Sequence, residues 1–324
     1  MDISNLWTLQ CMMFLLVAAG AVMKKMNILK ADSKAVITDL VIDFILPCNI
    51  INSFRVSFDV SILAKFAMVL AVSVLVQILS YFLSRCLYGR KEDAVKKVLQ
   101  YCTIVSNSGF LGLPIAEGVF GAEGLMYASI FIIPMRVMMW SAGIACFTET
   151  PDMRSVVKKL ALHPCIIAVY IGLGLLLLQQ PLGTAYEAVL ACPVTPVAVG
   201  SRMLVGALDK VVRSAGGCTT TLTMILIGTM LADVSPRDML DGNTLLITVV
   251  RLGLLPLIVL VGCRLFHVDA LLTGVCVMIT GMPAGSTSAI LAAKYNCDYV
   301  FATKCVVVST LLSMITIPLW CMAF

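Results

Sequence analysis

Ser106-Asn107-Ser108-Gly109-Phe110-Leu111-Gly112-Leu113-Pro114 lies inside Val98–Phe120, an apolar segment long enough to cross a bilayer. Its glycines, its Asn-Ser pair and its proline disfavour a continuous helix, because Gly costs about 1 kcal/mol and Pro about 3 kcal/mol relative to Ala in a helix interior. Backbone groups that such a break frees within a bilayer must be bonded inside the protein or face a water-filled cavity. The stretch therefore predicts a broken helix that lines a cavity.

The same signal returns near the C-terminus. Thr280-Gly281-Met282-Pro283-Ala284-Gly285-Ser286-Thr287-Ser288 interrupts a second apolar segment, Leu271–Ala293. Two spans that are interrupted by Gly and Pro at corresponding positions of two halves are typical of the substrate site of a transporter. We therefore expect the two breaks to form one site.

The composition points to a membrane. The chain of 324 residues is 60% hydrophobic and 13% charged, and its mean hydropathy is +1.01. Soluble domains are about 25% charged. We therefore predict an all-α integral membrane protein whose surface contacts the lipid bilayer, and we expect no nucleic-acid partner. The 13 cysteines form no CxxC pair, which is typical of small buried side chains rather than metal ligands. We expect no metal and no cofactor.

Apolar segments of about 20 residues predict ten transmembrane helices. They are Leu6–Met23, Ala35–Phe54, Ile62–Leu83, Val98–Phe120, Leu125–Phe147, Leu160–Leu178, Ser214–Leu231, Thr244–Phe266, Leu271–Ala293 and Tyr299–Phe324. The ten divide into five and five around a cytoplasmic loop at 149–159, so that 1–148 and 160–324 form two inverted repeats, each with a broken fourth helix.

The loops indicate an orientation. Lys and Arg residues are concentrated in the loops that face the cytoplasm if the N-terminus lies outside, and most of this bias comes from the first half. The basic pair Lys24-Lys25 follows the first apolar run, which describes a retained span rather than a cleaved signal. We predict a multi-pass protein of the plasma membrane with both termini extracytoplasmic.

One stretch competes with the count of ten. Ala188–Leu208 carries a single charge, Arg202, and could be an eleventh span. Because Pro193 and Pro196 lie in its interior, we favour an extracytoplasmic insert at 182–212 that is interfacial or re-entrant.

The two breaks resemble those of the auxin efflux carrier family, which includes bacterial malate permease-like proteins and the plant PIN-FORMED auxin exporters. Residues 107–114 with Phe120-Gly121, residues 281–288, and Met224–Ala232 carry the resemblance. It implies that the broken helices cross near Pro114 and Pro283. It also implies an elevator-type carrier in which spans one, two, six and seven form a scaffold, and a dimer through that scaffold. The long cytoplasmic loop of the plant exporters is absent, so auxin is not a favoured substrate.

Polar and small residues at the breaks are the candidates for substrate binding. Hydroxyl and amide side chains would bond the substrate beside freed backbone amides, where half-helix N-termini favour anions. Alternatively, they only satisfy the broken backbone. The candidates are Asn107, Ser108, Gly109, Gly112, Pro114, Pro283, Gly285, Ser286, Thr287 and Ser288.

Two arginines, Arg136 and Arg251, lie near the middle of predicted spans. A charge at the bilayer centre costs at least about 2.5–3.5 kcal/mol, so it usually faces a cavity or a partner. A guanidinium fork suits a carboxylate, which makes both candidates for substrate binding. Alternatively, each forms a structural ion pair with Asp43 or Glu117.

Glu117 and Asp43 are candidates for coupling to H⁺, with Na⁺ less favoured, because Glu117 follows Pro114 closely and Asp43 lies within a span. Asp43 could equally form an ion pair within the scaffold. Together these features favour a secondary transporter, not an enzyme, that moves small organic anions such as mono- or dicarboxylates. The alternatives are an anion channel or a ligand-sensing membrane protein.

Overall fold

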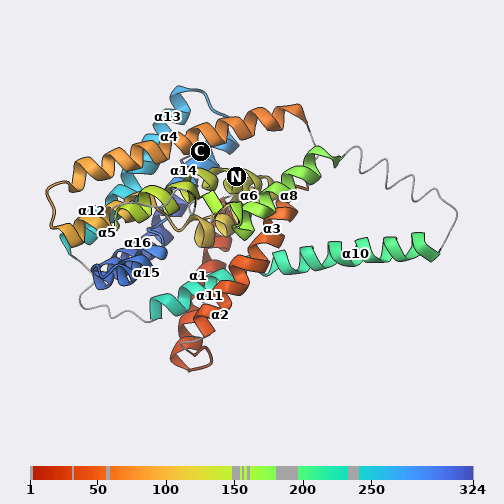
Figure 1. The fold of residues 1–324 in the computed structure, drawn as a ribbon, viewed down its shortest axis with the longest axis horizontal. Helices are drawn as coiled ribbons and strands as arrows, with labels where there is room; N and C mark the ends of the chain where they lie inside the picture. The colour runs from red at the N-terminus through yellow and green to blue at the C-terminus, as the bar shows by residue number, and fades with distance from the viewer. Residues whose placement is uncertain are drawn as a thin grey trace.

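The computed structural model describes residues 3–30, 33–55, 59–147, 154, 157–158, 161–179, 196–232 and 241–323. Throughout these ranges the regular structure is helical, and the one departure is an isolated β-bridge between Ser106 and Ala284. Figure 1 shows the helices crossing one another around a shared centre, with α10 extending away from the rest.

The helices of the first half are α1 (Ile3–Lys25), α2 (Ser33–Leu40), η1 (Val41–Ile45), α3 (Leu46–Ser53), α4 (Val60–Tyr88), α5 (Asp93–Ile104), η2 (Ser108–Gly112), α6 (Leu113–Met138) and η3 (Met139–Gly143). Those of the second half are α8 (Pro164–Leu177), α10 (Pro196–Gly217), α11 (Thr219–Ala232), α12 (Gly242–Val249), η5 (Val250–Leu254), α13 (Leu255–Leu265), α14 (Ala270–Thr280), α15 (Thr287–Lys294) and α16 (Tyr299–Cys321). The elements labelled η are π-helical turns.

Among the described residues, six helical stretches are long and apolar enough to cross a membrane. They are Val36–Ser53, Ser61–Tyr88, Ser108–Met138, Met203–Thr229, Gly242–Leu265 and Tyr299–Cys321, and the shorter apolar helices are Pro164–Leu177 and Ala270–Thr280. The predicted all-α membrane architecture is confirmed, whereas the count of ten and the inverted repeats remain predictions.

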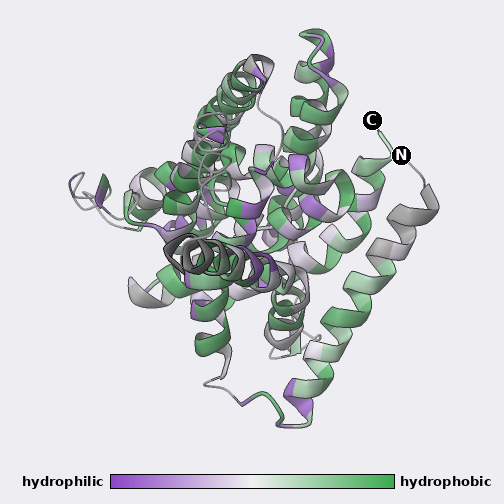
Figure 2. Ribbon diagram, turned by 90° about the vertical axis from the view of Figure 1, so that its right-hand side faces the viewer, coloured by the Kyte–Doolittle hydropathy of each residue, from purple (hydrophilic) through white to green (hydrophobic). Residues whose placement is uncertain are grey.

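Large apolar side chains cover the outer faces of several helices. On α4, Leu75 and Phe82 are 64% and 61% exposed, and on α10 Met203 is 72% exposed. Figure 2 shows that hydrophobic residues dominate the helices and that hydrophilic ones gather near the ends of elements and toward the centre. An outer surface of this kind is suited to lipid rather than to water.

Three of the π-helical turns end two residues before a proline: η1 before Pro47, η2 before Pro114 and η5 before Pro256. A proline has no N–H and its ring crowds the carbonyl four residues earlier, so the preceding turn widens. After Pro256, the carbonyl left free belongs to Leu252, and it accepts a bond of 2.7 Å from the indole Nε1 of Trp320. The backbone group freed at this kink is therefore bonded within the protein.

The boundary between the predicted fourth and fifth spans lies inside α6, at Gly121. Its backbone has φ 69° and ψ −163°, a region that is essentially restricted to glycine. The chain therefore changes direction where the sequence predicts a loop, although helical hydrogen bonding resumes on both sides.

The predicted seventh span differs from the structure. The sequence predicts it at Ser214–Leu231, whereas α10 continues to Gly217 and α11 begins at Thr219. Residues 180–195 lie outside the described ranges, and the rest of the predicted insert forms the first part of α10, with Pro196 at its start. Of the predicted connecting loop at 149–159, the structure describes Arg154, Val157 and Lys158.

Two sets of helices pack mainly within themselves. The α1 set consists of α1, α2, η1, α3, α8, α10 and α11, and the α6 set consists of α4, α5, η2, α6, η3, α12, η5, α13, α14, α15 and α16. The most extensive contact in the molecule, α1 with α11, lies inside the first set, and contacts between the sets are sparse. The α1 set contains the helices of predicted spans one, two, six and seven, which are the spans that the resemblance assigns to a scaffold.

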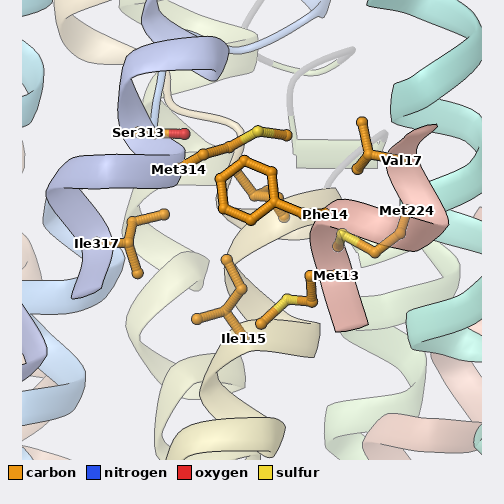
Figure 3. A pocket seen from close by; sticks show the side chains of 9 residues that line it. Met13, Phe14, Val17, Ile115, Met224, Ser313, Met314 and Ile317 are labelled. Carbon is orange, nitrogen blue, oxygen red and sulfur yellow. The ribbon is translucent and has the colours of Figure 1, made fainter. Parts of the chain in front are cut away.

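The interface between the sets is apolar and rich in methionine. Figure 3 shows Met13, Phe14 and Val17 of α1 facing Met314 and Ile317 of α16 around a small gap. The gap has about 20 Å³, roughly the space of one water, and its apolar walls would keep it dry. Methionine side chains adapt easily to changing neighbours, so this part of the interface can accommodate small shifts of one set against the other.

Within the α1 set, two glycines bring the backbones of α1 and α11 together. A Cβ added at Gly20 would lie 2.1 Å from the carbonyl oxygen of Ile225, and one added at Gly228 would lie 2.0 Å from that of Val17. Small residues at such crossings let membrane helices approach closely.

We expect Gly228→Ala to destabilise the protein by about 1–3 kcal/mol, because the added methyl group forces α1 and α11 apart. The apparent melting temperature in detergent measures this loss. Gly174→Ala on α8, where an added Cβ meets nothing within 4 Å, is the matched control and should leave the melting temperature unchanged. Equal melting temperatures for the two variants would contradict the close crossing.

Candidate functional site

The two broken helices meet at their breaks. Ser106 and Ala284 form an antiparallel bridge, in which the N–H of Asn107 donates to the carbonyl of Pro283 at 2.8 Å and the N–H of Gly285 donates to that of Val105 at 3.0 Å. Each break therefore supplies the hydrogen-bond partners that the other lacks. The interruptions predicted at these two stretches are present.

The apolar side of the crossing is tightly packed. A Cβ added at Gly112 would lie 3.0 Å from Cδ1 of Ile279 and 3.1 Å from Cγ of Met282. The Ser108 hydroxyl bonds that of Ser106 and donates to the carbonyl of Ile279 at 3.3 Å. Gly112 and Ser108 therefore pack the two breaks against each other.

Arg251 lies on η5 and bonds backbone from both breaks. Its side chain is buried, with 2% exposed. Its Nη1 donates to the carbonyl of Thr103 at 2.8 Å, its Nη2 to that of Thr280 at 3.2 Å, and its Nε to that of Met282 at 3.3 Å. Thr103 and Thr280 lie at the C-terminal ends of α5 and α14, where helices carry negative partial charge and lack intrahelical donors, and Met282 lies two residues beyond α14.

The position of Arg251 differs from what the sequence predicts. Neither Asp43 nor Glu117 is among its partners, and it does not line the cavity described below. Its bonds to three carbonyls favour a structural role that the sequence does not reveal, namely capping two half-helices at once.

A cavity of about 250 Å³ lies beside the crossing, between the two sets of helices. The α1 set contributes Ile42, Leu46, His163 and Cys165. The α6 set contributes Val105, Ser106, Asn107, Gly109, Phe110, Met135, Arg136, Met139, Gly285, Ser286 and Thr287. Cavities for drug-sized ligands measure about 300–1,000 Å³, so this one fits a smaller molecule.

Arg136 is the cation of this cavity. It is 6% exposed, and its Nε has no hydrogen-bond partner in the described part of the chain. Its Nη2 faces Gly109, where an added Cβ would lie 3.5 Å away. Because a buried donor without a partner is costly, this edge of the guanidinium is suited to an acceptor that the protein itself does not provide.

The two breaks place polar groups around this guanidinium. Asn107 is almost fully buried and lines the cavity, and no described residue bonds its side chain. Thr287 begins α15 at the cavity wall, and its hydroxyl bonds that of Tyr101 at 2.8 Å. Amides at the start of a helix favour a negative charge, so Arg136, Asn107 and α15 together favour an anion.

Six of the predicted binding residues line the cavity: Asn107, Gly109, Arg136, Gly285, Ser286 and Thr287. Ser108, Gly112, Pro114, Pro283 and Ser288 do not line it and lie in the crossing or the helices that leave it, and Arg251 on η5 does not line it either. Whether any of them binds a substrate remains a prediction.

The two coupling candidates lie in different settings. Glu117 on α6 is half-buried, and its Oε2 accepts a bond of 2.8 Å from Nδ2 of Asn49 on α3. This bond joins the α6 set to the α1 set. Asp43 is exposed on η1, next to Ile42 of the cavity wall. Neither carboxylate pairs with the two central arginines.

His163 belongs to the cavity, and sequence reasoning did not identify it as a site residue. It also caps a helix, since Nδ1 of its ring accepts a bond of 3.2 Å from the N–H of Cys165 at the start of α8. In addition, Nη1 of Arg136 lies 2.9 Å from Nδ1 and 2.6 Å from Nε2 of the ring. The two residues are 27 positions apart and lie on either side of the connecting loop, so the sequence does not indicate that they form a pair.

The helical fold suits a membrane protein, and the comparison with known proteins identifies its class as membrane transport. The chain belongs to the membrane transport protein family, whose model matches residues 9–321, and this is the auxin efflux carrier family that the sequence resembles. It is similar to an uncharacterised transporter of Methanothermobacter thermautotrophicus, with 25% identity over 309 residues and 94% of each chain covered. It is also similar to an uncharacterised transporter of Methanocaldococcus jannaschii, with 22% identity over 317 residues and again 94% of each chain.

Proposed function

We propose that this protein is a secondary active transporter for small organic anions, mono- or dicarboxylates, and that the substrate carboxylate binds Arg136. The observation that carries the proposal is the unpartnered Nε of a buried guanidinium at the wall of a 250 Å³ cavity. A carboxylate would bond Nε and Nη2 together, in the two-point geometry for which a guanidinium is suited.

The surroundings of Arg136 support an anion. A guanidinium buried among apolar groups needs a negative partner or several acceptors, and described carboxylates do not bond it. Asn107 and the start of α15 supply further donors. The apolar walls, such as Leu46, Phe110 and Met135, would strengthen these bonds by keeping water away.

The arrangement of the two sets supports an elevator mechanism. Arg136, Asn107, Gly285 and Thr287 all belong to the α6 set, so they would travel together, while the α1 set supplies the opposite wall. The apolar interface of Figure 3 suits sliding of one set along the other. We propose that the α6 set carries the substrate and that the α1 set is the scaffold, through which two copies would associate.

The antiparallel bridge supports the inverted repeats. Two broken helices that run antiparallel where they meet are expected if the halves have opposite orientations in the membrane. We propose ten spans in the plasma membrane, with both termini extracytoplasmic. Cysteine labelling of Thr8 and Ala323 from outside intact cells tests this orientation.

Flux measurements on purified protein in liposomes test the function. Radiolabelled lactate and malate represent the mono- and dicarboxylates, under imposed proton, sodium and counter-substrate gradients. Saturable flux of either would support a carrier, and single-channel currents would instead indicate an anion channel. If correctly folded protein moves no carboxylate under any gradient, the proposal is wrong.

We propose that Glu117 carries the coupling proton, because it is half-buried at the interface between the two sets. Glu117→Gln should abolish uptake driven by a pH gradient while leaving exchange of substrate for substrate, since the neutral amide can still bond Asn49. Glu123→Gln is the control, because Glu123 lies on the same helix but pairs with Lys65 at the surface. Loss of both transport modes in Glu117→Gln would contradict a role limited to coupling.

A further inference from the structure

The contact between Arg136 and His163 crosses the boundary between the two sets. Arg136 lies on α6, which packs against α4 and α14, whereas His163 precedes α8, which packs against α3 and η1. Side-chain hydrogen bonds that join the sets include those of Asn49 with Glu117 and of Arg136 with His163. A bond of this kind depends on the relative position of the sets.

The contact leaves one edge of the guanidinium open. His163 faces Nη1, while Nε has no partner and Nη2 points toward the space left by Gly109. An imidazole ring can accept a bond from Nη1 only when it is neutral. The α1 set therefore contacts the guanidinium at Nη1, and the edge formed by Nε and Nη2 faces the cavity.

We propose that His163 is a positioning residue for Arg136 that organises the carboxylate site in one of the two transport states. This inference rests on the proposed carrier function and identifies a residue that controls the affinity of its substrate site. When the α6 set slides along the α1 set, Arg136 moves away from His163 and its guanidinium loses this fixed orientation. The carrier consequently binds its substrate more tightly from the face on which the pair is formed.

The proposal predicts that substrate affinity differs between the two membrane faces and that this difference depends on the side chain of His163. Groups that orient a binding residue contribute about 10–100-fold to affinity at metal sites, and orientation of a guanidinium works in the same way. We expect loss of the His163 contact to raise the half-saturating concentration about tenfold at one membrane face. The value at the other face and the maximal rate should change little.

Two variants separate positioning from helix capping. His163→Ser keeps a favoured N-cap for α8 but is too short to reach Arg136, so it should show the one-sided loss with an unchanged melting temperature. His163→Gln supplies an oxygen acceptor at similar reach and should restore much of the affinity. Leu162→Ala, an exposed neighbour, is the control.

The experiment measures concentration-dependent flux of radiolabelled lactate and malate in right-side-out and inside-out vesicles. A loss in His163→Ser at one face, rescued by His163→Gln, supports the proposal. Equal losses at both faces, no loss at either, or no rescue by His163→Gln would overturn the positioning role while leaving the carrier intact. If the wild-type protein moves neither compound, the proposed function fails and this inference fails with it.

Discussion

Arg136→Gln is expected to reduce carboxylate transport by a factor of at least about 30. Removing one partner of a buried, hydrogen-bonded charge pair costs about 2–5 kcal/mol, and each 1.4 kcal/mol is about a factor of ten in affinity. Glutamine retains most of the volume and offers one amide N–H₂ group as a donor, but it has neither the charge nor the two-point edge formed by Nε and Nη2. Flux in liposomes and substrate-induced thermal stabilisation both measure this loss.

Arg136→Lys distinguishes charge from geometry. Lysine restores the positive charge but offers a single ammonium group, so we expect activity between that of the wild type and that of Arg136→Gln. Arg85→Gln, which changes an exposed arginine on α4, should transport normally. Unchanged flux in Arg136→Gln would mean that the carboxylate binds elsewhere and that this guanidinium has only a structural role.

Arg251→Met is expected to cause the largest loss of stability. It removes the donors for three buried carbonyls, those of Thr103, Thr280 and Met282. Each carbonyl left without a donor costs about 1–3 kcal/mol, although hydrogen bonds in membrane proteins average about 0.6 kcal/mol. Since proteins are stable by only about 5–15 kcal/mol, we expect poor yield and a lower melting temperature.

The control for this variant lies in the same apolar helical stretch, Gly242–Leu265. Arg264 is exposed on α13 and bonds the carbonyl of Ala323 near the end of the chain. Arg264→Met should therefore fold normally, and the difference in melting temperature between the two variants isolates the capping of the breaks. A stable Arg251→Met protein that has lost only substrate binding would favour the anion-binding alternative for Arg251.

The breaks could be predicted from the sequence because their cause is local. Gly109, Gly112 and Pro114 disfavour a helix wherever the chain places them, and so do Gly281 and Pro283. The change of chain direction near Gly121 could be predicted for the same reason, because a glycine there disfavours a continuous helix. These residues determine where a helix ends, and no knowledge of distant contacts is needed to identify them.

The partners of the two arginines could not be predicted. Arg251 bonds carbonyls that are up to 148 residues away. Because every residue has a backbone carbonyl, the sequence does not indicate which of them an arginine bonds. Ion pairs with carboxylates are the obvious alternative because acidic residues can be identified, yet the breaks supply enough acceptors for Arg251. The pair of Arg136 and His163 depends in the same way on how α6 and α8 approach each other.

The seventh span shows a limit of hydropathy. The charges at Asp209, Lys210 and Arg213 make hydropathy begin the span at Ser214, whereas α10 continues through them to Gly217, so composition alone does not reveal the helix end. A pair of glycines followed by a run of threonines marks that boundary better than the apolar count does.

The bridge between Ser106 and Ala284 has a consequence for synthesis. The ribosome completes the first break long before the second, so the carbonyl of Val105 and the N–H of Asn107 lack these partners until Gly285 and Pro283 have been made and inserted. Unpaired backbone groups are costly in lipid, so the nascent first half must keep its break hydrated or shielded. Final assembly of the membrane protein therefore waits for its C-terminal half, and the two halves, made as separate chains, should stabilise each other.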